Sequence, residues 1–161
     1  MTTFTFVDTS VLCELLQVPG KSSPAKAAAA RAEADRRHGA GERFVIPITA
    51  VIETGNHIAQ ADGNRYEVSG RLVGLLQMAL SETSPWRVLL TGLGPEFLSS
   101  LCAGDSTGQS LQTLAAARVG AGDVAILVER DQLLAASAAT SVQVWTFDES
   151  LAAQAAGRTS R

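Results

Sequence analysis

The sequence predicts a single α/β domain with a mostly parallel central sheet. Short runs of β-branched and aromatic residues alternate with longer stretches of helical character along the chain, which is the order typical of parallel sheets. The 161 residues suffice for one full core, and no repeat or linker divides them. We therefore expect one domain over residues 1–156 and a flexible polar tail over residues 157–161.

The first elements are separated by polar and proline-containing breaks. A strand is expected over residues 4–7, and the run Asp8-Thr9-Ser10 supplies side-chain oxygens that suit the start of a helix over residues 11–18. Pro19-Gly20 ends that helix. A second helix is expected over residues 24–38, because proline is tolerated in a first helical turn.

The next elements carry a polar pair on one helix face. A strand over residues 43–47 leads to a helix that we expect Thr49 to cap, and Glu53 and His57 lie four residues apart on that helix. A longer amphipathic helix is expected over residues 65–81. The remaining expected elements are a strand over 86–90, helices over 95–102, 111–119 and 124–138, a strand over 142–146 and a helix over 151–156.

Composition excludes several classes of protein. Hydrophobic residues make up 46% and charged residues 18% of the chain, which is typical of a globular rather than a disordered protein. No apolar run approaches the ~20 residues of a membrane span, and the N-terminus does not resemble a signal peptide. We therefore expect a cytoplasmic protein with no membrane partner. Cys13 and Cys102 are far apart, which argues against a zinc site or a disulfide, and we expect both to be buried and reduced.

Four acidic residues follow strands or lie near helix starts within apolar sequence: Asp8, Glu53, Asp123 and Asp148. Because ligands bind beyond the carboxyl ends of parallel strands, we expect the four to meet at one edge of the sheet. Carboxylates brought together there would repel one another unless a hard divalent cation compensated their charge. The pattern therefore predicts a metal-dependent site that handles phosphates, even though the net charge of −3 excludes nucleic-acid binding through bulk positive charge.

The sequence around these acids resembles the PIN domain family, which includes the VapC-like ribonuclease toxins. The resemblance covers most of the chain and rests on four motifs that occur in the family's order. They are Val7-Asp8-Thr9-Ser10-Val11-Leu12, Ile48-Thr-Ala-Val-Ile-Glu53-Thr, Gly122-Asp123-Val-Ala-Ile-Leu-Val-Glu129 and Val144-Trp-Thr146-Phe-Asp148-Glu-Ser-Leu151. Each motif is short, and the specificity lies in the four together.

The resemblance implies a Rossmann-like three-layer α/β/α sandwich that hydrolyses RNA with Mg²⁺ or Mn²⁺. Asp8, Glu53, Asp123 and Asp148 match the family's four catalytic and metal-binding acids. Ser10 matches the polar residue that supports the first acid, and Thr146 matches the hydroxyl residue two positions before the last. The resemblance also implies a role as the toxin of a type II toxin–antitoxin pair, with an antitoxin protein as partner and a homodimer as the assembly.

Other interpretations of the same residues stay open. Asp8, Asp123 and Asp148 also suit plain helix caps, and the chain could be a catalytically silent PIN-like module that binds RNA or serves as a scaffold. A HAD-like phosphatase is the weaker alternative, because Ser10 stands where that class needs a second aspartate. Five arginines are candidates for contacts with the RNA backbone, although each could instead lie on a solvated helix face. They are Arg36, Arg37, Arg65, Arg71 and Arg118. The acids expected to be surface charges are Asp62, Asp105, Asp131, Glu129 and Glu149.

Overall fold

The structure, a computed structural model, describes residues 1–89, 92–137 and 140–156. Within these ranges, four strands form one parallel sheet in the order β3-β2-β1-β4. Their bounds are β1 (Thr2–Val7), β2 (Arg43–Val45), β3 (Trp86–Arg87) and β4 (Thr140–Trp145). The prediction of an α/β fold with a parallel sheet is confirmed.

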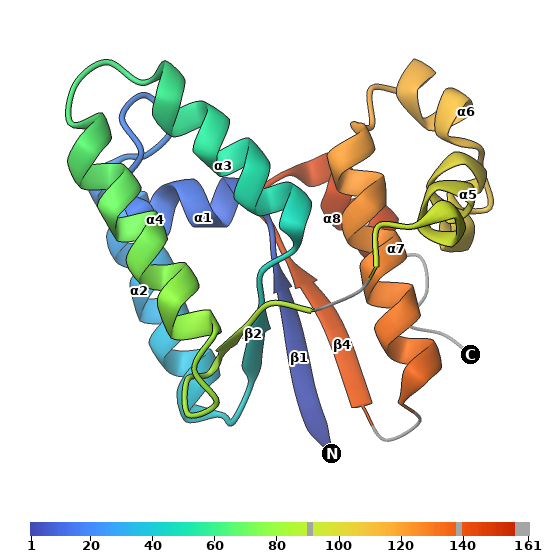
Figure 1. Cartoon of the computed structure of the whole chain (residues 1–161), viewed down its shortest axis with the longest axis horizontal. Helices are drawn as coiled ribbons and strands as arrows, with labels where there is room; N and C mark the ends of the chain where they lie inside the picture. Colours follow the sequence, from blue (N-terminus) through green and yellow to red (C-terminus); the bar gives the residue numbers. More distant parts are fainter. Residues whose placement is uncertain (90–91, 138–139, 157–161) are drawn as a thin grey trace.

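Helices cover both faces of this sheet (Figure 1). The helices on one side are α1 (Thr9–Leu16), α2 (Pro24–Gly39), α3 (Ile48–Gln60) and α4 (Arg65–Ala79). The helices on the other side are α5 (Pro95–Ala103), α6 (Leu111–Ala116), α7 (Ala121–Ala136) and α8 (Glu149–Ala156), together with the short 3-10 helix η1 (Asp105–Thr107). The arrangement has helix, sheet and helix layers, and the first turn of α7 lies against α3 (Figure 1).

Alternation along the strands explains why the sheet is buried on both faces. Val7 pairs in register with Trp145, and both belong to the core cluster under α1 and α4. Phe6 pairs with Val45, and both belong to the cluster on the opposite face, under α7 and α8. Neighbouring residues of one strand therefore supply two separate cores.

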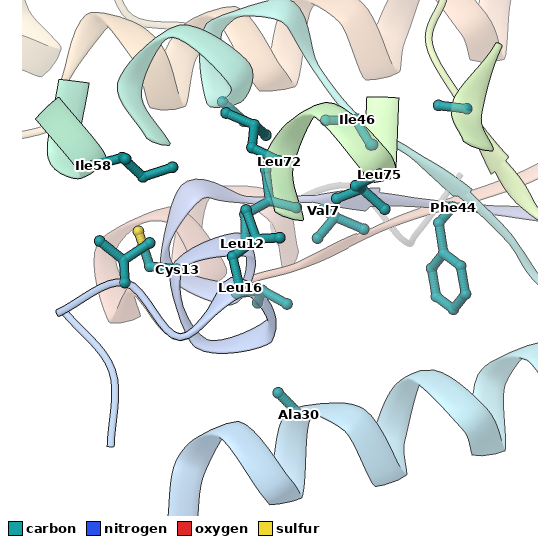
Figure 2. Close-up of a cluster of buried hydrophobic side chains, with 14 of the residues drawn as sticks. Val7, Leu12, Cys13, Leu16, Ala30, Phe44, Ile46, Ile58, Leu72 and Leu75 are labelled. Carbon is teal, nitrogen blue, oxygen red and sulfur yellow. The ribbon is translucent and has the colours of Figure 1, made fainter. Parts of the chain in front are cut away.

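The core on the α1 side is mostly aliphatic, with Phe44 and Trp145 as its buried aromatic residues (Figure 2). Leu12 and Leu16 lie four residues apart on α1, so they share the helix face that packs on the sheet. Leu72 and Leu75 of α4 join them in the same cluster. This packing holds the short helix α1 firmly on the sheet directly after β1, where the first of the four acids lies.

Several sequence-based boundaries need correction. Thr49 does not cap α3: the helix begins at Ile48 after Pro47, and the Thr49 hydroxyl is buried without a hydrogen-bond partner. The strand predicted over residues 86–90 is only two residues long, and Leu90 lies outside the described residues. The predicted tail at residues 157–161 also lies outside them. Cys13 is buried as expected, whereas Cys102 is exposed.

The helix before the last strand begins earlier than the sequence suggested. Gly120 is the N-cap of α7, and Gly122 lies inside its first turn. The predicted break at Gly120-Ala-Gly122 is therefore the helix start itself, and Asp123 is the third helical residue. Within the described ranges, no helix combines the length and the apolar character that crossing a membrane requires.

Candidate active site

A cleft of about 590 Å³ opens where β1 and β4 end, and all four predicted acids line it. Asp8 directly follows β1, and Asp148 follows β4 after two intervening residues. Glu53 comes from α3 and Asp123 from α7. The other charged or aromatic residues on the cleft wall are Glu14, Lys21, Lys26, His57 and Phe147.

Asp8 is the most firmly held of the four acids. Its side chain is only 3% exposed, and it begins α1 as the N-cap residue. Oδ2 accepts hydrogen bonds from the Ser10 hydroxyl and the Thr146 hydroxyl, each at 2.7 Å, and a longer one from the Ser10 backbone N–H at 3.3 Å. All of these bonds converge on one oxygen, so within the described part of the chain Oδ1 is left for a ligand.

Glu53 reaches the cleft because α7 lacks a side chain at one position. A Cβ atom at Gly122 would overlap the Glu53 carboxyl group, so only glycine lets the α3 acid lie against the first turn of α7. The Thr9 hydroxyl donates to Glu53 Oε2 at 2.8 Å and fixes the carboxylate from the side of α1. Sequence reasoning treated Gly122 as a helix breaker and missed this close approach.

Asp123 shows that the four acids share one electrostatic environment. Burial, together with the negative charges of Asp8, Asp148 and Glu53, raises the pKa of Asp123 to about 6. A hydrogen bond from the Gly120 backbone N–H to Asp123 Oδ2, at 3.3 Å, opposes that shift. A nearby cation would relieve this mutual repulsion.

Asp148 caps a helix and lines the cleft at the same time. Oδ1 accepts from the backbone N–H groups of Ser150 and Leu151, at 2.8 and 3.1 Å, in the first turn of α8. Its own backbone N–H donates to the Thr146 hydroxyl at 2.9 Å, which links it to the group that holds Asp8. The capping interpretation is thus correct for Asp8 and Asp148, and it does not compete with a role in the cleft.

Basic side chains line the same cleft, but none is ion-paired with these acids in the described part of the chain. In residues 1–89, 92–137 and 140–156, every ion pair lies elsewhere, and none involves Asp8, Glu53, Asp123 or Asp148. Nor does this part of the chain contain three or more His, Cys, Asp or Glu side chains arranged to hold a metal ion directly. The donor set is nevertheless the oxygen-only kind that Mg²⁺ prefers, and that ion keeps several of its waters, so ligation partly through water fits this wider spacing.

Lys21 and Lys26 are cleft residues that sequence reasoning missed. They are the only two lysines of the chain, and both line the cleft. Lys21 lies between α1 and α2, and Lys26 lies in the first turn of α2. Their position depends on how the chain folds back after α1, and no local pattern signals that.

The five arginines predicted to contact RNA do not line this cleft. Arg36 and Arg37 both pair with Glu33, and Arg37 also pairs with Glu42. Arg71 pairs with Glu67 and donates to the Leu16 carbonyl. Arg65 and Arg118 are exposed. A contact of any of the five with RNA stays a prediction.

Glu129 is not a surface charge, contrary to the prediction. It is 1% exposed, burial raises its pKa to about 7, and its Oε1 has no hydrogen-bond partner. The carboxyl group accepts from the Ile48 backbone N–H, at the start of α3. Glu129 thus serves the helix end that the preceding Pro47 leaves without a side-chain cap. Asp62, Asp105 and Glu149 are exposed as predicted, whereas Asp131 is half-buried beside Arg130.

The chain matches no protein-family model, no curated protein and no solved structure.

Proposed function

We propose that this protein is a metal-dependent ribonuclease of the PIN type, with a Rossmann-like fold, that hydrolyses RNA phosphodiester bonds. The observation that carries the proposal is the convergence of four carboxylates in one cleft. They come from four separate segments of the chain, and no basic side chain pairs with them in the described structure. An uncompensated acidic cluster lowers stability, so its presence favours a function that requires a cation.

Mg²⁺ or Mn²⁺ is the proposed cofactor, with Asp8, Asp123, Asp148 and Glu53 as its direct or water-mediated ligands. When bound, the ion supplies a more acidic water and neutralises charge on the leaving oxygen of the phosphodiester. The raised pKa of Asp123 supports this assignment, because the neighbouring acids that cause part of the shift are the other proposed ligands.

Hydroxyl groups of the chain hold the proposed ligand side chains in fixed orientations. Ser10 and Thr146 hold one oxygen of Asp8, so the other is presented in a single orientation. Thr9 holds Glu53 in the same way, which suits it to orient a water molecule or to complete a second metal position. Fixed donors of this kind matter because small displacements in a catalytic site cost large factors in rate.

The resemblance to VapC-like proteins extends the proposal to the biological setting. It favours a cytoplasmic toxin that is restrained by an antitoxin and assembles as a homodimer. These three points rest on the resemblance alone, and the nuclease proposal does not depend on them.

The test is cleavage of a mixed RNA pool by the purified protein in Mg²⁺, Mn²⁺ or EDTA. We expect cleavage with metal only, and we expect Asp8→Asn and Asp123→Asn each to reduce it by more than roughly a hundredfold, since even residues that merely support metal ligands contribute 10- to 100-fold. Glu149→Gln is the matched control, because Glu149 is an exposed acid next to Asp148 that does not line the cleft.

Cleavage that persists in EDTA, or that survives both aspartate substitutions, would overturn the proposal. Failure of the folded protein to cleave with any metal would instead favour a catalytically silent RNA-binding or scaffold module. Circular dichroism of each variant separates loss of activity from loss of fold.

A further inference from the structure

One aromatic side chain stands exposed on the wall of the acidic cleft. Phe147 is 51% exposed and lies between Thr146, which holds Asp8, and Asp148. A scattered exposed hydrophobic residue needs no explanation by itself. Phe147 differs because its ring borders a charged cleft that is proposed to handle a polynucleotide.

The structure holds Phe147 in place. Its backbone N–H donates to the Ser10 hydroxyl at 2.9 Å, and this hydroxyl also donates to Asp8. Its ring meets the Trp145 ring edge-on, with 6.4 Å between centroids and an interplanar angle of 79°. The buried Trp145 thus supports one edge of the ring, and the ring keeps a fixed position relative to Asp8.

The two cleft lysines are available for an external anion. Neither Lys21 nor Lys26 forms an ion pair in the described part of the chain, although five carboxyl groups line the same cleft. Both side chains are exposed. A second hollow of about 370 Å³ shares Lys21 and His57 with the cleft, so an extended chain has room to continue past Lys21.

We propose that Phe147 stacks on one unpaired base of the RNA in this cleft, and that Lys21 and Lys26 hold backbone phosphates beside it. The inference rests on the proposed nuclease function and names residues that would bind its RNA substrate. Stacking on an aromatic ring requires an unpaired base, because neighbouring bases already cover the faces of each base in a duplex. Every base offers a π-face, so recognition through Phe147 tolerates any sequence at that position.

The test measures binding separately from cleavage. Fluorescence anisotropy with labelled single-stranded and duplex RNA, in Mg²⁺, uses protein that carries Asp123→Asn so that the strand stays intact. We expect Phe147→Ala to weaken single-strand binding by about tenfold, and Phe147→Trp to retain it. Duplex RNA should bind more weakly than the single strand and should not respond to either change.

Two further sets of variants complete the design. Tyr66→Ala removes an aromatic side chain that is 94% exposed on α4 and does not line the cleft, so it should bind as the parent does. Lys21→Ala and Lys26→Ala should each weaken binding and reduce the slope of log affinity against log salt by about 0.7.

The outcomes separate this inference from the nuclease proposal. Binding that depends on Phe147 supports the inference even if the wild-type protein never cuts RNA. Unchanged binding of Phe147→Ala overturns it even if the wild-type protein cuts RNA in a metal-dependent way. Equal affinity for duplex and single strand, or no binding of single-stranded RNA at all, also overturns it.

Discussion

Acidic side chains in two regions of this molecule differ in whether a basic side chain is ion-paired with them in the described structure. Glu42, just before β2, accepts hydrogen bonds on Oε2 from Thr5, Gln143 and Arg37, at 2.6, 2.8 and 3.2 Å. Arg37 is itself held by a second carboxylate and by the Trp145 ring, whose centroid lies 5.1 Å from its guanidinium carbon. The acids of the cleft have hydroxyl and backbone partners, but no guanidinium or ammonium group pairs with them in the described structure.

The difference separates an acid that is part of the fold's own ion pairs from acids that we propose bind a cation. The guanidinium group of Arg37 compensates the charge of Glu42, so this carboxylate needs no ligand from outside the protein. In the cleft the hydrogen bonds orient the carboxylates but no ion pair in the described structure offsets their charge, and the proposed cation would supply that compensation. A cluster of acids is thus best judged by which partners it lacks.

The largest effect is expected when one cleft carboxylate is displaced while its chemistry stays the same. Gly122→Ala would push the Glu53 carboxylate aside, and we expect cleavage to fall by roughly a hundredfold, as for other small misplacements in catalytic sites. Stability should change little, because only the end of a flexible side chain has to move. RNA cleavage and urea unfolding measure the two effects.

Gly120→Ala is the matched control two residues away. Its Cβ would stand 3.5 Å from Asp123 Oδ2, an ordinary contact, and the backbone there suits alanine. Equal activity in the two alanine variants would contradict the role assigned to the Glu53–Gly122 approach.

Metal binding should stabilise the protein through the cleft acids and not through Glu42. At about 100 times its dissociation constant, Mg²⁺ or Mn²⁺ should raise the free energy of unfolding by about 2.7 kcal/mol, which corresponds to several degrees in Tm. Asp8→Asn should abolish this increase, whereas Glu42→Gln should keep it. Differential scanning calorimetry with and without the ion checks both, and an equal increase in all three proteins would indicate non-specific binding.

Removing the carboxylate of Glu42 should lower stability, whereas removing the charge of a cleft acid should not. Glu42→Ala leaves Arg37 and Gln143 without their shared acceptor in a partly buried place, and we expect it to lower the free energy of unfolding by about 2 kcal/mol. Glu53→Gln, measured without metal, should leave stability unchanged or raise it, because it removes one of several repelling charges. Urea titration measures both variants, and an equal loss of stability in the two would contradict the distinction between Glu42 and the cleft acids.

The smallest expected effect is a pH dependence of the metal-free protein. Because the pKa of Asp123 rises from its ordinary 3.8 to about 6 in the folded state, folding favours its protonated form. The resulting stability is present below about pH 4 and is lost as the pH rises through about 6. Allowing for the partial exposure of this side chain, we expect a loss of about 1 kcal/mol, absent in Asp123→Asn.

Glu129 provides the control for this pH effect. Its pKa is raised to about 7 chiefly by burial, and it does not line the cleft. Saturating Mg²⁺ should therefore suppress the pH-dependent loss due to Asp123 and leave the loss due to Glu129, which Glu129→Gln would remove. Unfolding curves between pH 4 and 8 distinguish the two contributions.

The sheet was predictable because its signals are local. Alternating apolar residues and the breaks at Pro19-Gly20 and Ser84-Pro85 mark strands and turns, and the parallel order follows from the intervening helices. β1 nevertheless starts two residues earlier than expected, because Thr2 and Thr3 pair with Thr140 and Ser141 of β4. A polar pair of this kind gives no apolar signal in either strand.

The four acids were predictable for a similar reason, because the topology brings residues that follow parallel strands to one edge. Lys21, Phe147 and Gly122 were not, since their importance arises from what lies opposite them in space. Glu129 was misjudged because it receives the Ile48 N–H from a segment about eighty residues earlier in the chain. Local sequence cannot show that a glutamate on one helix completes the end of another.

The pairing of β1 with β4 sets the order in which the cleft can be completed during synthesis. β1 occupies an inner position of the sheet, and the Thr146 hydroxyl that holds Asp8 is 138 residues further along the chain. A ribosome that has reached only the end of α7 has therefore produced three of the four acids, with the first one lacking one of the hydroxyls that orient it. The cleft stays incomplete until β4 and the segment after it have left the exit tunnel, so the proposed nuclease activity would begin only after nearly the whole chain has been synthesised.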